Sequence, residues 1–226
     1  MNNTFAAIMF DMDGTLFDTE RLGMEISIAV LKDMGIEMTE AYYAELLAGT
    51  DEEFVHKMRD MYGDAFDLQA FLKESYTKMD ALLALSPLPE KPGLRVLLDY
   101  LIANDYKLAI VTATRKSRTL DYLEKAGIRE YFSGIICGDM ISRGKPFPDI
   151  YLKAAELLDV APQDCLAVED TLKGVRSAKA AGYTTVLIPD LAVSSEEEQQ
   201  RCVDFSFHSL VDVKSLLEST DESIWG

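Results

Sequence analysis

The sequence predicts an α/β protein in which a doubly wound, Rossmann-like parallel sheet carries an inserted bundle of four helices. Short apolar runs alternate with helical patterns along most of the chain, and these runs lack the polar alternation of a sheet with one solvated face. After the first run, however, roughly 70 residues show helical periodicity only, which is too long for an ordinary connection. Parallel strands covered by helices on both faces have such continuous apolar runs.

The expected strands are the short apolar runs at 5–10, 107–111, 134–137, 165–168 and 184–188, with a last short strand at 205–207. Helices are expected between them because apolar residues recur there at three- and four-residue spacing. These helices cover 93–104, 117–126, 149–159, 172–181 and, near the C-terminus, 210–217. Gly127 and Gly182 follow two of them, where a residue of left-handed conformation commonly ends a helix.

Residues 16–86 follow the first strand and are interpreted as a helical insertion, since a strand-to-helix connection normally takes only about 2–6 residues. Its four helices are expected at 20–34, 39–47, 51–62 and 67–85. The prolines of 86–93 prevent helix continuation and mark the return to the sheet. We therefore expect a core of residues 1–15 and 87–226, with a hinged cap of residues 16–86.

The charge and the apolar content of the chain exclude several classes of partner. Acidic residues outnumber basic ones by 39 to 22, which leaves a formal net charge of −17. Nucleic acids and anionic membranes attract basic surfaces, so neither partner is expected. No apolar run approaches the about 18 residues that cross a bilayer, and no signal peptide is evident, so the prediction is a cytoplasmic protein. A monomer is expected because the cap must move freely.

The most informative motif is Asp11-Met-Asp13-Gly-Thr15, directly after the first expected strand. Ligands of open parallel sheets bind beyond the carboxyl ends of the strands. Two carboxylates at such an end can converge on a divalent cation while one of them faces a substrate. The plain alternative is an acidic turn that only ends the strand.

Three further segments follow other expected strands. Thr112 offers a hydroxyl and, with Ala113, backbone N–H groups that can hold a phosphoryl oxygen, although a turn or helix cap is the simpler interpretation. Lys145 stands between Gly144 and Pro146 and can neutralise phosphate charge, whereas most lysines are solvated surface charges. The pair Glu169-Asp170 supplies oxygen ligands of the kind that Mg²⁺ prefers.

In this order, the four segments resemble the four motifs of the haloacid dehalogenase superfamily of phosphohydrolases. The resemblance covers essentially the whole chain, and the insertion is similar to the small α-helical (C1-type) cap of phosphoglycolate phosphatases and β-phosphoglucomutases. It implies a sheet of order 3-2-1-4-5. It also implies that Asp11 attacks phosphorus to form an aspartyl-phosphate and that Asp13 is the general acid and base.

The same resemblance implies a Mg²⁺ site and a phosphate site. Asp11, Asp170 and the backbone carbonyl of Asp13 would hold Mg²⁺, with Glu169 as an additional or second-sphere ligand. Thr112, Ala113 and Lys145 would hold the phosphoryl group and stabilise its charge during transfer.

The cap is expected to set the substrate, with Glu20, Arg21 and Thr50 as its candidate contacts. Mutases with this cap carry a histidine in the first cap helix and an arginine before the third, whereas the sequence has Glu20-Arg-Leu-Gly23 and Gly49-Thr-Asp-Glu-Glu53 there. Arg21 could replace that arginine in space. We therefore expect a Mg²⁺-dependent phosphatase of a small phosphorylated metabolite, such as a sugar phosphate, with a sugar-phosphate mutase as the alternative. A phospho-accepting signalling module is more remote, because receiver domains lack an insertion after the first strand.

Overall fold

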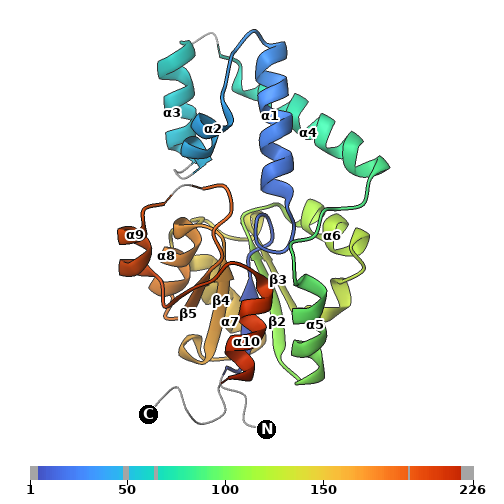
Figure 1. Cartoon of the computed structure of the whole chain (residues 1–226), viewed down its shortest axis with the longest axis vertical. Coiled ribbons are helices and arrows are strands. Elements are labelled where there is room, and N and C mark those ends of the chain that lie inside the picture. Colours follow the sequence, from blue (N-terminus) through green and yellow to red (C-terminus); the bar gives the residue numbers. More distant parts are fainter. Residues whose placement is uncertain (1–4, 48–50, 64–65, 193, 220–226) are drawn as a thin grey trace.

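Six parallel strands form one sheet in the computed structural model, which describes residues 5–47, 51–63, 66–192 and 194–219 (Figure 1). The strand order is β3-β2-β1-β4-β5-β6. The strands are β1 (Ala7–Phe10), β2 (Lys107–Thr112), β3 (Gly134–Cys137), β4 (Cys165–Glu169), β5 (Thr184–Leu187) and β6 (Phe205–Ser206). The predicted fold class and the order 3-2-1-4-5 are confirmed, and the expected last strand extends the sheet beyond β5.

Helices cover both faces of this sheet. One face carries α5 (Leu94–Ala103), α6 (Lys116–Lys125) and α10 (Leu210–Glu218), and the other carries α7 (Asp149–Leu158) and α8 (Leu172–Ala180). The short α9 (Glu196–Cys202) packs beside α8. Single 3₁₀ turns, η1 (Arg129–Tyr131), η2 (Gly138–Met140) and η3 (Pro162–Asp164), complete the core. None of the helices in the described part of the chain is both long and apolar enough to cross a membrane.

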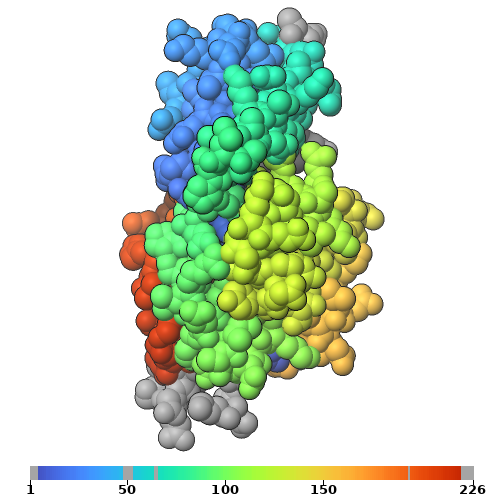
Figure 2. Space-filling model, turned by 90° about the vertical axis from the view of Figure 1, so that its right-hand side faces the viewer, coloured from blue at the N-terminus to red at the C-terminus, as the bar shows by residue number. Residues whose placement is uncertain are grey.

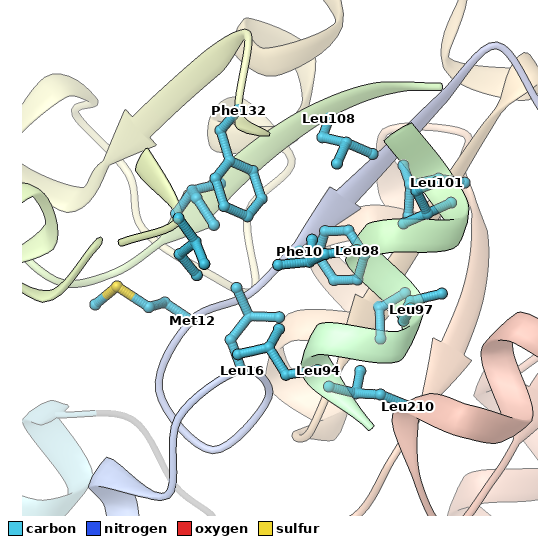
Figure 3. Packing of buried hydrophobic residues seen from close by; sticks show 14 of the residues in the cluster. Phe10, Met12, Leu16, Leu94, Leu97, Leu98, Leu101, Leu108, Phe132 and Leu210 are labelled. Carbon is cyan, nitrogen blue, oxygen red and sulfur yellow. The ribbon is translucent and has the colours of Figure 1, made fainter. Parts of the chain in front are cut away.

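Helix α5 shows why the apolar spacing produces this packing. Its leucines recur at three- and four-residue intervals and belong to one buried cluster with Phe10 of β1 and Leu108 of β2. In Figure 3, Leu98 lies beside Phe10, and Leu101 is the nearest of the α5 leucines to Leu108. Each leucine of α5 is at most 1% exposed, and burial of one such side chain stabilises the fold by about 1.5–3 kcal/mol. The residues are Leu94, Leu97, Leu98 and Leu101. The central strand β1 is buried on both faces, as its continuous apolar run predicts.

Helices α1 (Thr19–Asp33), α2 (Glu40–Leu47), α3 (Asp51–Tyr62) and α4 (Leu68–Leu85) lie together beyond the carboxyl ends of the strands (Figure 1). They enclose a hydrophobic cluster of their own, which includes Met24, Leu31, Tyr43, Met58 and Phe71. All four expected helices of the insertion are present with ends within one residue of the prediction.

The two chain segments that lead into and out of these helices, residues 16–18 and 89–91, are hydrogen-bonded to each other and are called the crossing segments below. The N–H of Asp18 donates to the carbonyl of Pro89 at 2.9 Å, and the N–H of Lys91 donates to the carbonyl of Leu16 at 2.9 Å. Phe17 and Glu90 form an antiparallel bridge between these bonds. Leu16 and Phe17 are fully buried among the core leucines, so the first residues of the predicted insertion pack with the sheet.

Candidate active site

The register of the sheet brings the predicted segments together. Phe10, the last residue of β1, lies opposite Ile110 of β2 and Val168 of β4, so the ends of these three strands lie within two residues of one another. Asp11 follows directly, and its N–H donates to the carbonyl of Val168 at 3.0 Å. The residues just beyond the strands therefore meet at one edge of the sheet.

Three buried carboxylates form a cluster at this edge. One oxygen from each of Asp11, Glu169 and Asp170 lies within 4.8 Å of the others. Burial raises the pKa of Asp11 to about 8 despite the Lys145 cation, and the Glu169 charge adds to that rise. Burial also raises the pKa of Asp170 well above its usual range, with repulsion from Asp11 and Glu169 as further causes. Charged carboxylates at this spacing need more positive charge than one lysine supplies.

Lys145 lies within this cluster, with only 5% of its side chain exposed. Its Nζ donates to Asp11 Oδ1 at 2.5 Å, to Glu169 Oε1 at 2.6 Å and to the carbonyl of Val111 at 2.9 Å. Burial alone would lower the pKa of Lys145, but the Asp11 and Glu169 carboxylates outweigh that effect and raise it. Lys145 is therefore a permanent cation beside Asp11.

The cluster meets the requirements of a hard divalent cation. Its donors are carboxylate oxygens, which Mg²⁺ and Ca²⁺ prefer. Glu169 Oε2 is buried and has no hydrogen-bond partner among the described residues. Burial raises the pKa values of Asp11 and Asp170, and repulsion between the carboxylates adds to the rise. A cation held by these carboxylates would reduce the repulsion between them.

Asp13 is held by two threonine hydroxyls. Thr19 Oγ1 donates to Asp13 Oδ1 at 2.6 Å, and Thr114 Oγ1 donates to Asp13 Oδ2 at 2.7 Å. Thr19 begins α1 of the helical insertion, whereas Thr114 lies in the loop after β2. The carboxylate is thus held from the start of α1 and from the loop after β2. Thr114 shares the strand-end position that pointed to Thr112, but no local sequence signal identifies Thr19.

Gly14 makes room for Asp170. Its φ is +79°, and a Cβ atom there would lie 2.2 Å from Asp170 Oδ2. Thr15 Oγ1 lies 3.5 Å from Asp170 Oδ1, so the same turn also contacts the carboxylate through a hydroxyl. The motif that begins with Asp11 thereby shapes the position of Asp170, 155 residues later in sequence than Thr15.

Thr112 and Ala113 lie at the adjacent strand end. The buried Thr112 hydroxyl accepts a hydrogen bond from the N–H of Thr114 at 3.1 Å, which is the turn-capping role of the simpler interpretation. The exposed Ala113 packs its carbonyl against Gly138, where a Cβ would come within 2.1 Å of that oxygen. This close packing fixes the loop that faces Asp13.

The cap candidates occupy different places. Glu20 lies beside the cluster, because its Cγ is 3.2 Å from the Cβ position of Gly14 and its charge helps to raise the pKa of Asp170. Arg21 is exposed, and its guanidinium lies 3.5 Å from the Asp18 carboxylate before α1 and 3.8 Å from the Asp190 carboxylate in the loop after β5. Thr50 lies outside the described residues.

A contact between α4 and α6 adjoins the site. Arg118 of α6 pairs with Asp80 of α4 at 2.7 Å, and its guanidinium carbon lies 4.6 Å from the ring centroid of Tyr76. In Figure 2, α4 lies directly over α6 at this contact. Tyr122 belongs to the same region: burial raises its pKa to about 12, and the nearby Asp13 charge contributes.

Comparison with known proteins identifies the class that this fold and site define. Residues 8–188 match the model of the haloacid dehalogenase-like hydrolases, and the chain belongs to that family. The expected enzyme class, a phosphoric monoester hydrolase of this family, is thereby confirmed.

Individual relatives span most of the chain. The sequence is 31% identical over 180 residues to a phosphorylated carbohydrates phosphatase of Thermotoga maritima, which covers 80% of this chain and 83% of the relative. It is 28% identical over 193 residues to the β-phosphoglucomutase of Bacillus subtilis, covering 80% and 81%. The crystal structure of CbbY from Rhodobacter sphaeroides in complex with phosphate superposes with a TM-score of 0.78 at 30% identity, covering 92% of this chain and 96% of CbbY.

Proposed function

We propose that the protein hydrolyses a small phosphorylated metabolite, such as a sugar phosphate, with Mg²⁺ and through an aspartyl-phosphate on Asp11. The observation that carries this proposal is the position of Asp11, buried between the Lys145 cation and the carboxylates of Glu169 and Asp170 at the end of the central strand. The similarity to a phosphatase of phosphorylated carbohydrates supports the substrate class.

Two steps would complete the reaction. An Asp11 oxygen attacks phosphorus while the bond to the leaving oxygen breaks, and Asp13 gives that oxygen its proton. Asp13 then takes a proton from water as the water oxygen attacks the aspartyl-phosphate, which releases phosphate and restores Asp11. The hydroxyls of Thr19 and Thr114 hold the Asp13 carboxylate in place for both proton transfers.

The remaining residues would provide positive charge and hydrogen bonds. Asp11, Asp170 and the carbonyl of Asp13 would hold Mg²⁺, with Glu169 as a further or second-sphere ligand. The ion supplies charge that offsets the repulsion between a carboxylate nucleophile and an anionic phosphate. Lys145 and the backbone at Thr112 and Ala113 would hold phosphoryl oxygens and stabilise the transferring group.

We further propose that residues 16–86 act as a cap on a core of residues 1–15 and 87–226. The hydrogen-bonded crossing segments and the separate hydrophobic cluster of α1–α4 support this division. Closure over the site would exclude bulk water and bring Glu20 toward the substrate.

The decisive experiment measures phosphate release from p-nitrophenyl phosphate in the presence of Mg²⁺. Asp11→Asn should lower kcat at least about 10³-fold, because the amide cannot replace the nucleophilic oxygen. Glu25→Gln, at an exposed position of α1, is the matched control and should keep the wild-type rate. An unchanged rate in Asp11→Asn would exclude Asp11 as the nucleophile.

The same protein, assayed with sugar phosphates, separates hydrolysis from isomerisation. Release of phosphate should exceed interconversion of sugar phosphates at all concentrations of added bisphosphate. Bisphosphate-dependent interconversion that is faster than phosphate release would instead identify a mutase, and a long-lived phosphoprotein without turnover would identify a signalling module.

A further inference from the structure

We propose that Tyr151 is a positioning residue whose hydroxyl fixes the Glu169 carboxylate and thereby aims Lys145 at Asp11. This inference rests on the proposed function, because it assigns a task to the lysine that would neutralise the phosphoryl group. Tyr151 lies in α7, on the face of the sheet opposite α5 and α6, and its hydroxyl contacts Glu169 at the end of β4.

The contacts of Tyr151 are specific and fully buried. Its hydroxyl donates to Glu169 Oε1 at 2.5 Å, and the same oxygen accepts from Lys145 Nζ at 2.6 Å. The Tyr151 ring also lies 5.5 Å from that Nζ, which places an aromatic face beside the cation. Tyr151 itself is 0% exposed, so water cannot replace its hydroxyl without rearrangement.

The three N–H donors of Lys145 explain why the orientation of the Glu169 carboxylate affects phosphate binding. An ammonium group has three N–H donors, and here they reach Asp11, Glu169 and the carbonyl of Val111. A phosphoryl oxygen can therefore be bound only in exchange for one of these partners. With Glu169 and Val111 fixed, the bond to Asp11 is the one that exchanges when phosphate arrives and Asp11 attacks.

The Tyr151 hydroxyl restricts rotation of the Glu169 carboxylate, whose second oxygen is not held by a hydrogen bond from any described residue. Oε2 has no hydrogen-bond partner in the described part of the chain, so the carboxylate would otherwise be free to present either oxygen, or both, to Lys145. Lys145 would then follow the carboxylate away from Asp11. The Tyr151 hydroxyl removes this freedom by holding Oε1 in the direction of the lysine.

Gly174 limits the carboxylate from the other side. A Cβ atom at this position would lie 1.9 Å from Glu169 Oε2 and 2.1 Å from Cδ, so the carboxylate fills the space that a side chain would occupy. Gly174 lies in the first turn of α8, where its N–H donates to Thr171 Oγ1 at 3.1 Å. Alanine normally stabilises a helix relative to glycine. At this position it should instead displace Glu169.

Tyr183 provides a matched control for Tyr151. The two rings are 5.2 Å apart, and the Tyr183 hydroxyl donates to the backbone carbonyl of Tyr151 at 2.8 Å. Phenylalanine at either position removes one buried hydroxyl and leaves the ring. Only the change at Tyr151 removes a contact with Glu169, so a merely structural role predicts similar effects at both positions.

The experiment compares Tyr151→Phe with Tyr183→Phe by steady-state kinetics on p-nitrophenyl phosphate, by Tm, and by inhibition with inorganic phosphate. Tyr151→Phe should lower kcat about 10- to 100-fold and weaken phosphate inhibition, whereas Tyr183→Phe should lower Tm with kcat within about twofold. Gly174→Ala should lower kcat as Tyr151→Phe does. Gly144→Ala, where no atom lies within 4 Å of the added Cβ, should not.

Each outcome has a distinct meaning. Equal kcat values in the two phenylalanine variants, with an active wild type, would overturn the role of Tyr151 and leave the proposed function intact. If Gly174→Ala fails to fold, the pair of phenylalanine variants decides alone. A wild-type protein that neither releases phosphate from monoesters nor binds inorganic phosphate would overturn the proposed function, and the role of Tyr151 with it.

Discussion

At Gly14 the absence of a side chain is a requirement of the site. The glycine has a left-handed backbone, and the space where its Cβ would lie is taken by the carboxylate of Asp170. Two requirements therefore favour glycine at this residue: the left-handed backbone conformation and the close approach of the Asp170 carboxylate. Gly35 has the same φ of +79° but no atom within 4 Å of its Cβ position, so the two effects can be separated.

We expect Gly14→Ala and Gly35→Ala each to lose about 1–2 kcal/mol of stability, because alanine is strained at this φ. Only Gly14→Ala should also lower kcat, by at least about tenfold, since it alone pushes against Asp170. Urea denaturation and phosphate release from p-nitrophenyl phosphate check the two parts. Equal activity of the two variants would show that Asp170 does not depend on the space at Gly14.

Most of the site residues expected from the sequence lie at or just beyond the end of a buried strand, and Lys145 lies in the longer loop after β3. Asp11, Lys145 and Asp170 meet because the sheet aligns the ends of its strands, and strand ends can be located in a sequence. Thr19 and Tyr151 were missed because their contacts depend on where α1 begins relative to Asp13 and on how α7 packs against the sheet. Local periodicity places a residue on a helix, but it does not give the distance from that helix to a carboxylate on another element.

Among the elements, helix ends were predicted more closely than strand ends. The first strand was expected from residue 5 but begins at Ala7, because the N–H of Ala6 donates to the carbonyl of Asp164 outside the ladder. β2 and β4 extend one residue further than expected, to Thr112 and Glu169. Apolar runs report burial, whereas a strand is defined by its hydrogen bonds, and these continue into the polar residues of the site.

The crossing segments also carry an ionic contact that ties them to the core. Lys91 Nζ lies 2.8 Å from Asp190 Oδ1 and 3.4 Å from Asp18 Oδ1. Asp190 belongs to the loop after β5, and only 3% of its side chain is exposed. This contact joins the exit from α4, the entrance to α1 and the sheet at one point.

Lys91→Met should therefore destabilise the protein by about 3 kcal/mol, because it leaves Asp190 buried without its nearest cation. The double variant Lys91→Met/Asp190→Asn should recover part of that loss. Lys78→Met is the control, since its partner Asp33 has a side chain that is 69% exposed and little change is expected. Denaturant titrations that show equal losses for the two lysine variants would contradict a buried ionic contact.

For the molecule as a whole, binding of a divalent cation should be visible as added stability. Mg²⁺ at about 100 times its Kd adds about 2.7 kcal/mol, or roughly 5–10 °C in Tm for a chain of this size. Burial holds the pKa of Asp11 near 8, so protons compete with the ion below that pH. The increase in Tm should thus be larger at pH 8 than at pH 6.

Scanning calorimetry with Mg²⁺ or EDTA at the two pH values measures this effect without reference to activity. Asp170→Asn should abolish the increase, whereas Glu25→Gln should retain it. A wild-type Tm that is the same with Mg²⁺ and with EDTA would speak against a metal site in the carboxylate cluster.

The distribution of charge over the whole chain should select against highly charged substrates. Residues 16–86 contain 15 of the 39 acidic residues but only 6 of the 22 basic ones. We expect kcat/KM for nucleoside triphosphates to be at least about tenfold below that for compact monophosphates, and salt should narrow the gap by screening. Equal or higher kcat/KM for triphosphates at low salt would overturn this expectation.

The pairing of Leu16 and Asp18 with Lys91 and Pro89 has a consequence for how such a chain can diversify. Because the entering and leaving segments are hydrogen-bonded neighbours, the intervening helices form one long loop whose two ends are held together. The entropic cost of closing a loop grows only with the logarithm of its length. Helical bundles of other sizes could therefore be exchanged at this point of the chain, changing which molecules reach Asp11 while the geometry of Asp11 and Lys145 is inherited unchanged.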